Sequence, residues 1–100
     1  MHTKNLTIVA NIYAVKGKGA LLKSELQKLI KPTLEEEGCV QYDLHCNNEN
    51  PEHFIFFENW KTRSLWLDHM QTSHIKQYMK NTEGFIKDFI VHEMTQIDSL

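Results

Sequence analysis

Residues 53 to 74, HFIFFENWKTRSLWLDHMQTSH, hold most of the side chains of this sequence that could do chemistry. His69 and His74 are of the type that takes up or releases a proton near neutral pH. Glu58 adds a carboxylate, and the aromatic side chains of the stretch could hold a planar ligand. The stretch therefore predicts either the wall of a pocket where acid–base chemistry is done or a packed core that includes two histidines.

Spacing argues against other kinds of site. His69 and His74 are five residues apart, which is about 140° around a helix, whereas two metal ligands on one helix are usually about four residues apart. Because of this spacing we expect no dedicated metal site. The GKG sequence at 17–19 lacks the pattern of a phosphate-binding loop, and Cys39 has no evident histidine partner that would make it a nucleophile.

The composition is that of a globular protein, with 41% hydrophobic and 24% charged residues. One hundred residues suffice for one domain, 1–100, and a net charge of −2 gives no attraction for nucleic acid or an anionic membrane. No apolar stretch approaches the roughly 18 residues that span a bilayer, and the N-terminal apolar run lacks the cleavage site of a secretory leader. Cys39 and Cys46 lie too far apart in one predicted strand to form a disulfide. We therefore expect a cytoplasmic protein with reduced thiols.

The elements that must position these side chains follow from hydrophobic periodicity. Strands are predicted at 6–14, 39–46, 53–60 and 88–98, and a helix at 18–37 that Gly38 would end. A second helical region begins after Thr62 or Ser64, and the sequence QTS at 71–73 offers a cap for a further helix. The order βαββαβ is typical of the ferredoxin-like α+β fold, an antiparallel sheet with its helices on one face.

The predicted third strand is apolar on both faces. Its even-numbered side chains from Phe54 to Trp60 share one face, which we expect to lie against the helices. Four apolar side chains are assigned to the other face of the sheet: Ile8, Ile12, Ile55 and Phe57. A patch of this size needs a cover, and a homodimer that packs two sheets face to face provides the simplest one.

Three segments carry a resemblance to a known family: TIVANIYAVKGK, LEEEGCVQYDLH and FIFFENWKTRSLWLDHMQTSHI. The most specific parts are EGCVQYDL, where a Gly-Cys pair precedes an aromatic strand residue, and the spacing of Glu58, Trp60, His69, Ser73 and His74. In these features the chain resembles the antibiotic biosynthesis monooxygenase superfamily, which includes quinol and anthrone monooxygenases. The resemblance implies that two ferredoxin-like domains form a dimeric α/β barrel.

The resemblance also implies a function. The monooxygenases of this kind use no metal or flavin, because a deprotonated quinol can itself pass an electron to dioxygen. We therefore expect a cofactor-independent monooxygenase for a small quinol or polyphenol, with His69 as the base and Asn11 as a second catalytic residue that binds a substrate oxygen. Residues that could wall or orient the ring are the substrate-binding candidates: Trp60, Trp66, Phe54, Phe56, Glu58, His74 and Tyr42.

Other interpretations stay open at this point. The chain could be an isomerase or degrading enzyme for a small oxygenated signal molecule, with His69 as a proton shuttle, or a non-catalytic dimeric module that binds a small ligand. Haem degradation is disfavoured, because the tryptophan and histidine typical of such enzymes fall at His69 and Met79. Each candidate also has a structural alternative: His74 could cap a helix, Asn11 could tie down a neighbouring element, and Glu58 could pair with Arg63.

Overall fold

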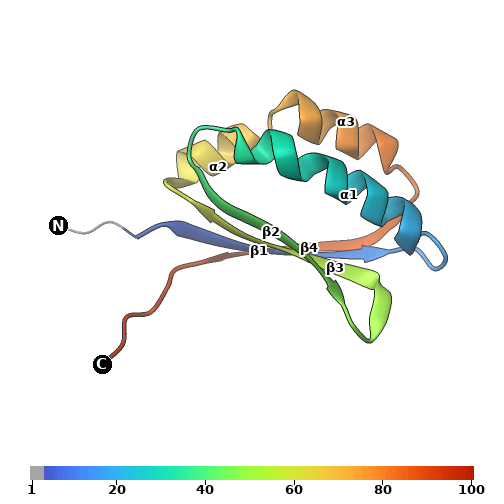
Figure 1. Ribbon diagram of the computed structural model, residues 1–100, viewed down its shortest axis with the longest axis horizontal. Helices are drawn as coiled ribbons and strands as arrows, with labels where there is room; N and C mark the ends of the chain where they lie inside the picture. Colours follow the sequence, from blue (N-terminus) through green and yellow to red (C-terminus); the bar gives the residue numbers. More distant parts are fainter. Residues whose placement is uncertain (1–3) are drawn as a thin grey trace.

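Residues 4–100 are described by a computed structural model, shown in Figure 1. Residues 1–3, which precede the N-terminal apolar run, lie outside the described part. The chain forms strands β1 (Leu6–Ala14), β2 (Cys39–Asn47), β3 (Asn50–Trp60) and β4 (Ile86–Met94), and helices α1 (Gly19–Leu34), α2 (Arg63–His69) and α3 (Ser73–Asn81). The predicted βαββαβ order is thus confirmed, with the second helical region divided into two helices.

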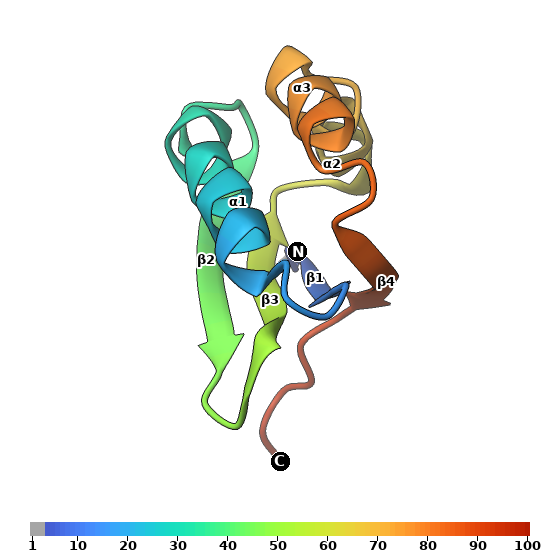
Figure 2. The ribbon, with the colours of Figure 1, turned by 90° about the vertical axis from the view of Figure 1, so that its right-hand side faces the viewer.

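The strands form one antiparallel sheet in the order β2-β3-β1-β4, and the helices cover one of its faces (Figures 1 and 2). Seen end-on in Figure 2, α1 lies above β2 and β3, while α2 and α3 lie on the side of β4. Leu22, Leu26 and Leu29 of α1 are buried in the layer between the helices and the sheet. Within residues 4–100, no helix combines the length and the apolar character needed to cross a membrane.

The pairing of β1 with β3 corrects one prediction. Ile8 lies opposite Glu58 and Ile12 lies opposite Phe54, and residues directly opposite in an antiparallel pair share a face. Ile8 and Ile12 therefore point toward the helices and are buried, whereas they were predicted on the outer face. Alternation in a strand separates its two faces but does not say which one meets the helices.

The outer face of the sheet, away from the helices, carries Val9, Asn11 and Tyr13 of β1 beside Ile55 and Phe57 of β3. The prediction that Ile55 and Phe57 lie on this face is confirmed. All five side chains are half-buried in the single chain.

Helix α1 ends earlier than predicted. Its C-cap is Glu35, so Glu36 and Glu37 lie in the turn beyond the helix and not in its last turn. Gly38 follows with a φ of +90°, where a side chain would be strained, and a Cβ atom there would lie 2.5 Å from Leu65 Cδ1. The close approach of Leu65 therefore requires glycine at this turn. Strand β4 is also displaced from its predicted range, since it begins at Ile86 and ends at Met94.

Threonine side chains cap both short helices, and each is one of the cap residues that the sequence offered. Thr62 Oγ1 accepts a hydrogen bond from the Leu65 N–H at 3.1 Å, and Thr72 Oγ1 accepts one from the Ile75 N–H at 3.4 Å. The Thr72 hydroxyl also donates to the carbonyl oxygen of His69 at 2.8 Å. Thr72 therefore fixes the end of α2 against the start of α3.

Candidate active site

An apolar cavity of about 300 Å³ lies between the helices and the sheet. Its walls come from all four strands and all three helices of residues 4–100, and its polar side chains include Tyr42, Glu58 and His69. Its volume is near the lower end of the range for small-molecule sites, roughly 300 to 1,000 Å³. The cavity therefore has room for a small ring-shaped ligand, and its lining disfavours water.

The structure brings five of the predicted site residues to this cavity: Phe56, Glu58, Tyr42, Trp66 and His69. Two other candidates, Trp60 and Phe54, are 0% and 2% exposed and belong to the core. His74 lies beside His69, as described below.

Asn11 lies on the opposite side of the sheet from the cavity. Its register partner is Ile55, and its Oδ1 is 2.9 Å from His53 Nε2. The ring of His53 in turn stacks on Tyr13, with ring centres 4.2 Å apart. Asn11 thus ties down a neighbouring strand, the structural alternative considered above, and in this chain it cannot reach a ligand in the cavity.

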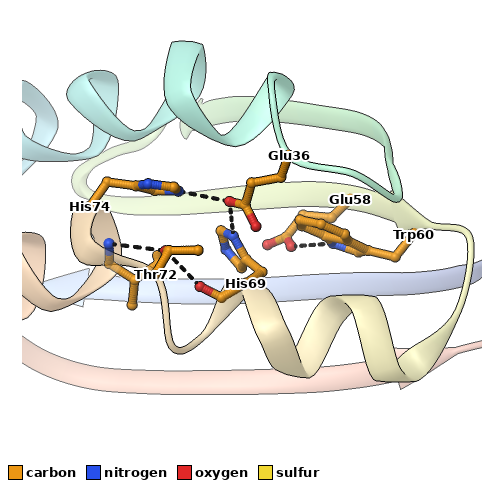
Figure 3. Close-up of polar contacts among 7 residues, drawn as sticks. Glu36, Glu58, Trp60, His69, Thr72 and His74 are labelled. Carbon is orange, nitrogen blue, oxygen red and sulfur yellow. Dashed lines mark hydrogen bonds and ion pairs between the residues drawn. The ribbon is translucent and has the colours of Figure 1, made fainter.

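His69 and His74 meet on a single carboxylate oxygen, as Figure 3 shows. His69 Nδ1 and His74 Nε2 each lie 2.7 Å from Glu36 Oε2. The separation of about 140° between the two histidines holds only for one continuous helix, whereas they lie in two helices. Because His69 ends α2 and His74 is the second residue of α3, the corner at Thr72 turns both rings toward the loop after α1.

The contact with Glu36 determines which nitrogen of His69 is available for chemistry. An ionised carboxylate can only accept hydrogen bonds, so Nδ1 of His69 must carry the proton. In the neutral ring Nε2 then keeps its lone pair. Burial lowers the pKa of His69, although the hydrogen bond and charge of Glu36 act in the opposite direction. The ring is therefore a neutral base at the edge of the cavity.

Glu58 is a second titratable group on the cavity. Its side chain is buried, and its Oε1 accepts a hydrogen bond from Trp60 Nε1 at 2.9 Å. Burial raises the pKa of Glu58 to about 7, even though the hydrogen bond from Trp60 lowers it. The predicted alternative of a pair with Arg63 is wrong, because Arg63 binds Glu93 at 2.7 Å. Glu58 can therefore donate or accept a proton near neutral pH.

Aromatic rings surround His69. The Tyr42 ring stacks on Phe56 with 4.3 Å between centres and meets His69 edge-on at 5.6 Å, and the Trp60 ring centre is 4.7 Å from that of His69. Burial, with the nearby charge of Glu58, raises the pKa of Tyr42. Its hydroxyl therefore stays protonated and can donate a hydrogen bond inside the cavity.

Glu36 is the site residue that the sequence did not reveal. A weak signal was present, since three successive glutamates at the C-terminal end of a helix are unfavourable for the helix dipole. The structure resolves this conflict by placing Glu36 beyond the helix, where two histidines bind it.

The comparisons with known proteins agree with this architecture. The family model described as antibiotic biosynthesis monooxygenase matches residues 5–81. The chain is 27% identical over 90 residues to YgiN of Escherichia coli K12, which is named a probable quinol monooxygenase, with 79% of this chain and 86% of YgiN covered. It is 25% identical over 81 residues to the Synechocystis protein sll1783, with 81% of this chain covered, and spans 55% of the length of that protein.

A solved structure is also closely similar. The crystal structure of PA3566 from Pseudomonas aeruginosa matches with a TM-score of 0.93 and 26% identity, covering 98% of this chain and 99% of that one. The likeness extends over the whole ferredoxin-like fold, and the family match includes Glu36, Glu58, His69 and His74. The chain therefore belongs to the antibiotic biosynthesis monooxygenase family.

Proposed function

We propose that the chain is a monooxygenase that oxidises a small quinol or polyphenol with dioxygen and without a cofactor. One observation carries the proposal: the buried base His69, oriented by Glu36, borders an apolar cavity that also contains the titratable Glu58. The substrate class follows from the aromatic lining and from the name of the E. coli relative.

The cavity supplies binding and the exclusion of water. A planar ring would lie against Phe56, Tyr42 and Trp66, which border the cavity, with its hydroxyl group at His69. The few polar atoms at the cavity would act in a medium of low dielectric, where their effect on a developing charge is larger than in water.

The reaction would begin with proton transfer. Nε2 of His69 takes a proton from a substrate hydroxyl, and the resulting anion passes one electron to dioxygen. The substrate radical and superoxide then combine, so that a C–O bond forms at a ring carbon that carries hydrogen. Glu58, which borders the same cavity, would in its protonated form donate a proton to the peroxide and give a hydroperoxide.

The second half of the reaction breaks the O–O bond. The Glu58 carboxylate takes the hydrogen of the ring carbon from the hydroperoxide. The distal oxygen leaves as hydroxide, which takes the proton held by His69 and departs as water. For a quinol the balance is one quinol plus one dioxygen giving one hydroxyquinone plus one water. The substrate supplies all the electrons, so no external reductant is needed.

Oxygen uptake tests the proposal. Tag-free protein is mixed with a panel of quinols and polyphenols, including menadiol, in an oxygen electrode. We expect uptake above the spontaneous rate with at least one compound, and a loss of about a hundredfold or more in kcat for His69→Gln. His45→Gln, which changes an exposed histidine of β2, is the matched control. Wild-type rates in a folded His69→Gln protein would remove His69 as the base.

Oxygen uptake also distinguishes a monooxygenase from an isomerase and from a non-catalytic binding module. A base and an acid that border one cavity, His69 and Glu58, could also move a proton between two carbons, which is an isomerase reaction. An isomerase would convert its substrate at an unchanged oxygen concentration, and a non-catalytic binding module would bind without turnover.

We also infer that two copies form a dimer through the outer face of the sheet. The half-buried Val9, Ile55 and Phe57 make this face apolar. Light scattering on a sizing column should give twice the chain mass for the wild type and the single mass for Phe57→Asp. Leu21→Asp, on the solvent side of α1, should stay dimeric. A monomeric wild type at micromolar concentration would overturn the inference.

A further inference from the structure

We propose that Glu36, His69 and His74 form a binding site for one divalent transition-metal ion. Their donor atoms all lie within 4.8 Å of one another, and each comes from a different segment: the turn after α1, the end of α2 and the start of α3. The site goes beyond the proposed function and does not rest on it, because metal binding needs neither quinol nor dioxygen.

The donor set defines the class of ion. Two imidazole nitrogens and one carboxylate oxygen suit zinc, iron, cobalt or nickel, whereas magnesium and calcium prefer ligand sets of oxygen alone. Three protein ligands on one side of an ion leave further positions for water or another small ligand. The cluster therefore favours an open site for a first-row transition metal.

The side chains of the cluster must shift to accept an ion, and two of the three have room to do so. Around zinc, with bonds of about 2.0 to 2.2 Å, neighbouring ligand atoms lie roughly 3 to 3.5 Å apart. Glu36 Oε2 is 2.7 Å from each of the two imidazole nitrogens. The side chains of Glu36 and His74 are 13% and 20% exposed, so they can shift and an ion can reach them from solvent. Buried His69, 3% exposed, would be the rigid ligand.

The surrounding contacts hold the ligands in place before an ion arrives. Thr72 donates to the His69 carbonyl and caps α3, which fixes His69 relative to His74 (Figure 3). Gly38 has no side chain, so Leu65 packs directly against its left-handed backbone. This contact fixes the turn that carries Glu36. Such supporting contacts usually decide how well a metal site is formed.

Metal binding requires a tautomer change in each neutral ring. The hydrogen on Nδ1 of His69 moves to Nε2, and the hydrogen on Nε2 of His74 moves to Nδ1, which frees the two lone pairs that face Glu36. An ion at this site and the basic form of His69 Nε2 are therefore mutually exclusive.

The test uses the metal alone. Tag-free protein is treated with a chelator, dialysed and titrated with Co²⁺, whose visible absorption reports imidazole and carboxylate ligands, and then with Zn²⁺ in competition. We expect one ion per chain, displacement of Co²⁺ by Zn²⁺, and no displacement by millimolar Mg²⁺. His74→Gln and Glu36→Gln should each weaken binding by about tenfold or more.

Two exposed positions provide matched controls. His45→Gln and Glu37→Gln change the same residue types at positions outside the cluster, and should bind as the wild type does. Circular dichroism checks that every variant is folded. The proposal is overturned by an absence of saturable Co²⁺ binding in the wild type, or by equal affinity in the controls and in folded His74→Gln and Glu36→Gln.

Discussion

His69 Nδ1 lies 2.7 Å from Oε2 of Glu36, a residue 33 positions earlier in the chain. This contact joins the end of α2 to the turn after α1 and orients the imidazole at the cavity. Without it, the ring could exchange tautomers and present either nitrogen to a ligand. The relationship therefore turns a buried histidine into a base with a defined lone pair.

Replacing Glu36 tests that role. In Glu36→Gln the negative charge is lost and the amide can donate as well as accept, so the Nδ1–H tautomer is no longer enforced. We expect kcat for the quinol to fall about tenfold or more, while KM changes little. Because Glu36 raises the pKa of His69, the acidic limb of the kcat/KM profile should also move to lower pH. Glu37→Gln is the control, and an unchanged pH profile in Glu36→Gln would contradict the assignment.

The free energy of unfolding should fall as the pH rises, because Glu58 holds a proton in the folded chain. The pKa of Glu58 is raised from 4.5 to about 7 on folding, so between these values the folded chain holds a proton that the unfolded chain has lost. The free energy of unfolding then falls by about 1.4 kcal/mol per pH unit, on the order of 3 kcal/mol in all, and levels off above pH 7.

Urea unfolding of wild type and Glu58→Gln from pH 4 to 9 measures this effect. The lowered pKa of His69 gives a slope of opposite sign below pH 6.5 in both proteins, so the difference between them isolates Glu58. We expect Glu58→Gln to gain stability relative to the wild type as the pH rises. Parallel stability curves would show that Glu58 titrates normally in the folded chain.

Gly38 lies in the turn that carries Glu36, and Gly17, in another turn, is a matched control for its backbone conformation. Both have a positive φ, +90° and +84°, but a Cβ atom on Gly38 overlaps Leu65, whereas Gly17 has nothing within 4 Å. Gly17→Ala should therefore lower the free energy of unfolding by about 1 kcal/mol, through backbone strain alone. Gly38→Ala should lower it by about 2 kcal/mol or more, because the overlap with Leu65 adds to the strain. Chemical denaturation compares the two, and equal losses would rule out a packing role for Gly38.

Zinc should inhibit turnover if both proposals hold. A bound ion removes the lone pair that makes His69 a base, so oxygen uptake with menadiol should fall over the Zn²⁺ range in which binding occurs. In His74→Gln, inhibition relative to its own metal-free rate should need about ten times more Zn²⁺. Equal sensitivity of the two proteins would place the inhibitory ion elsewhere.

Much of the fold follows from local pattern, but the convergence of two histidines on Glu36 does not. The strands, the threonine caps and the two faces of β3 are readable because alternation and capping are properties of neighbouring residues. Ile8 and Ile12 were assigned to the wrong face because the choice of face depends on the pairing of β1 with β3. Asn11 was assigned to the site for the same reason, whereas it lies on the outer face of the sheet.

The convergence on Glu36 needed the tertiary structure. The sequence predicted a break between His69 and His74, but the direction of the chain at Thr72 comes from packing against α1 and the sheet. A carboxylate 33 residues away cannot be associated with His69 by spacing. By contrast, His69, Glu58, Tyr42, Phe56 and Trp66 were predicted from residue type and resemblance, and the structure places them all at the cavity.

Isotope transfer from dioxygen is the sharpest test of the proposed monooxygenase reaction. Wild-type protein is incubated with menadiol under 18O2, and the product is analysed by mass spectrometry against a protein-free sample and the His69→Gln variant. We predict a hydroxyquinone that contains one 18O atom, with the second atom in water, and almost none of this product with His69→Gln. A wild-type product without 18O would rule out the monooxygenase reaction, and equal labelling with His69→Gln would rule out His69 as its base.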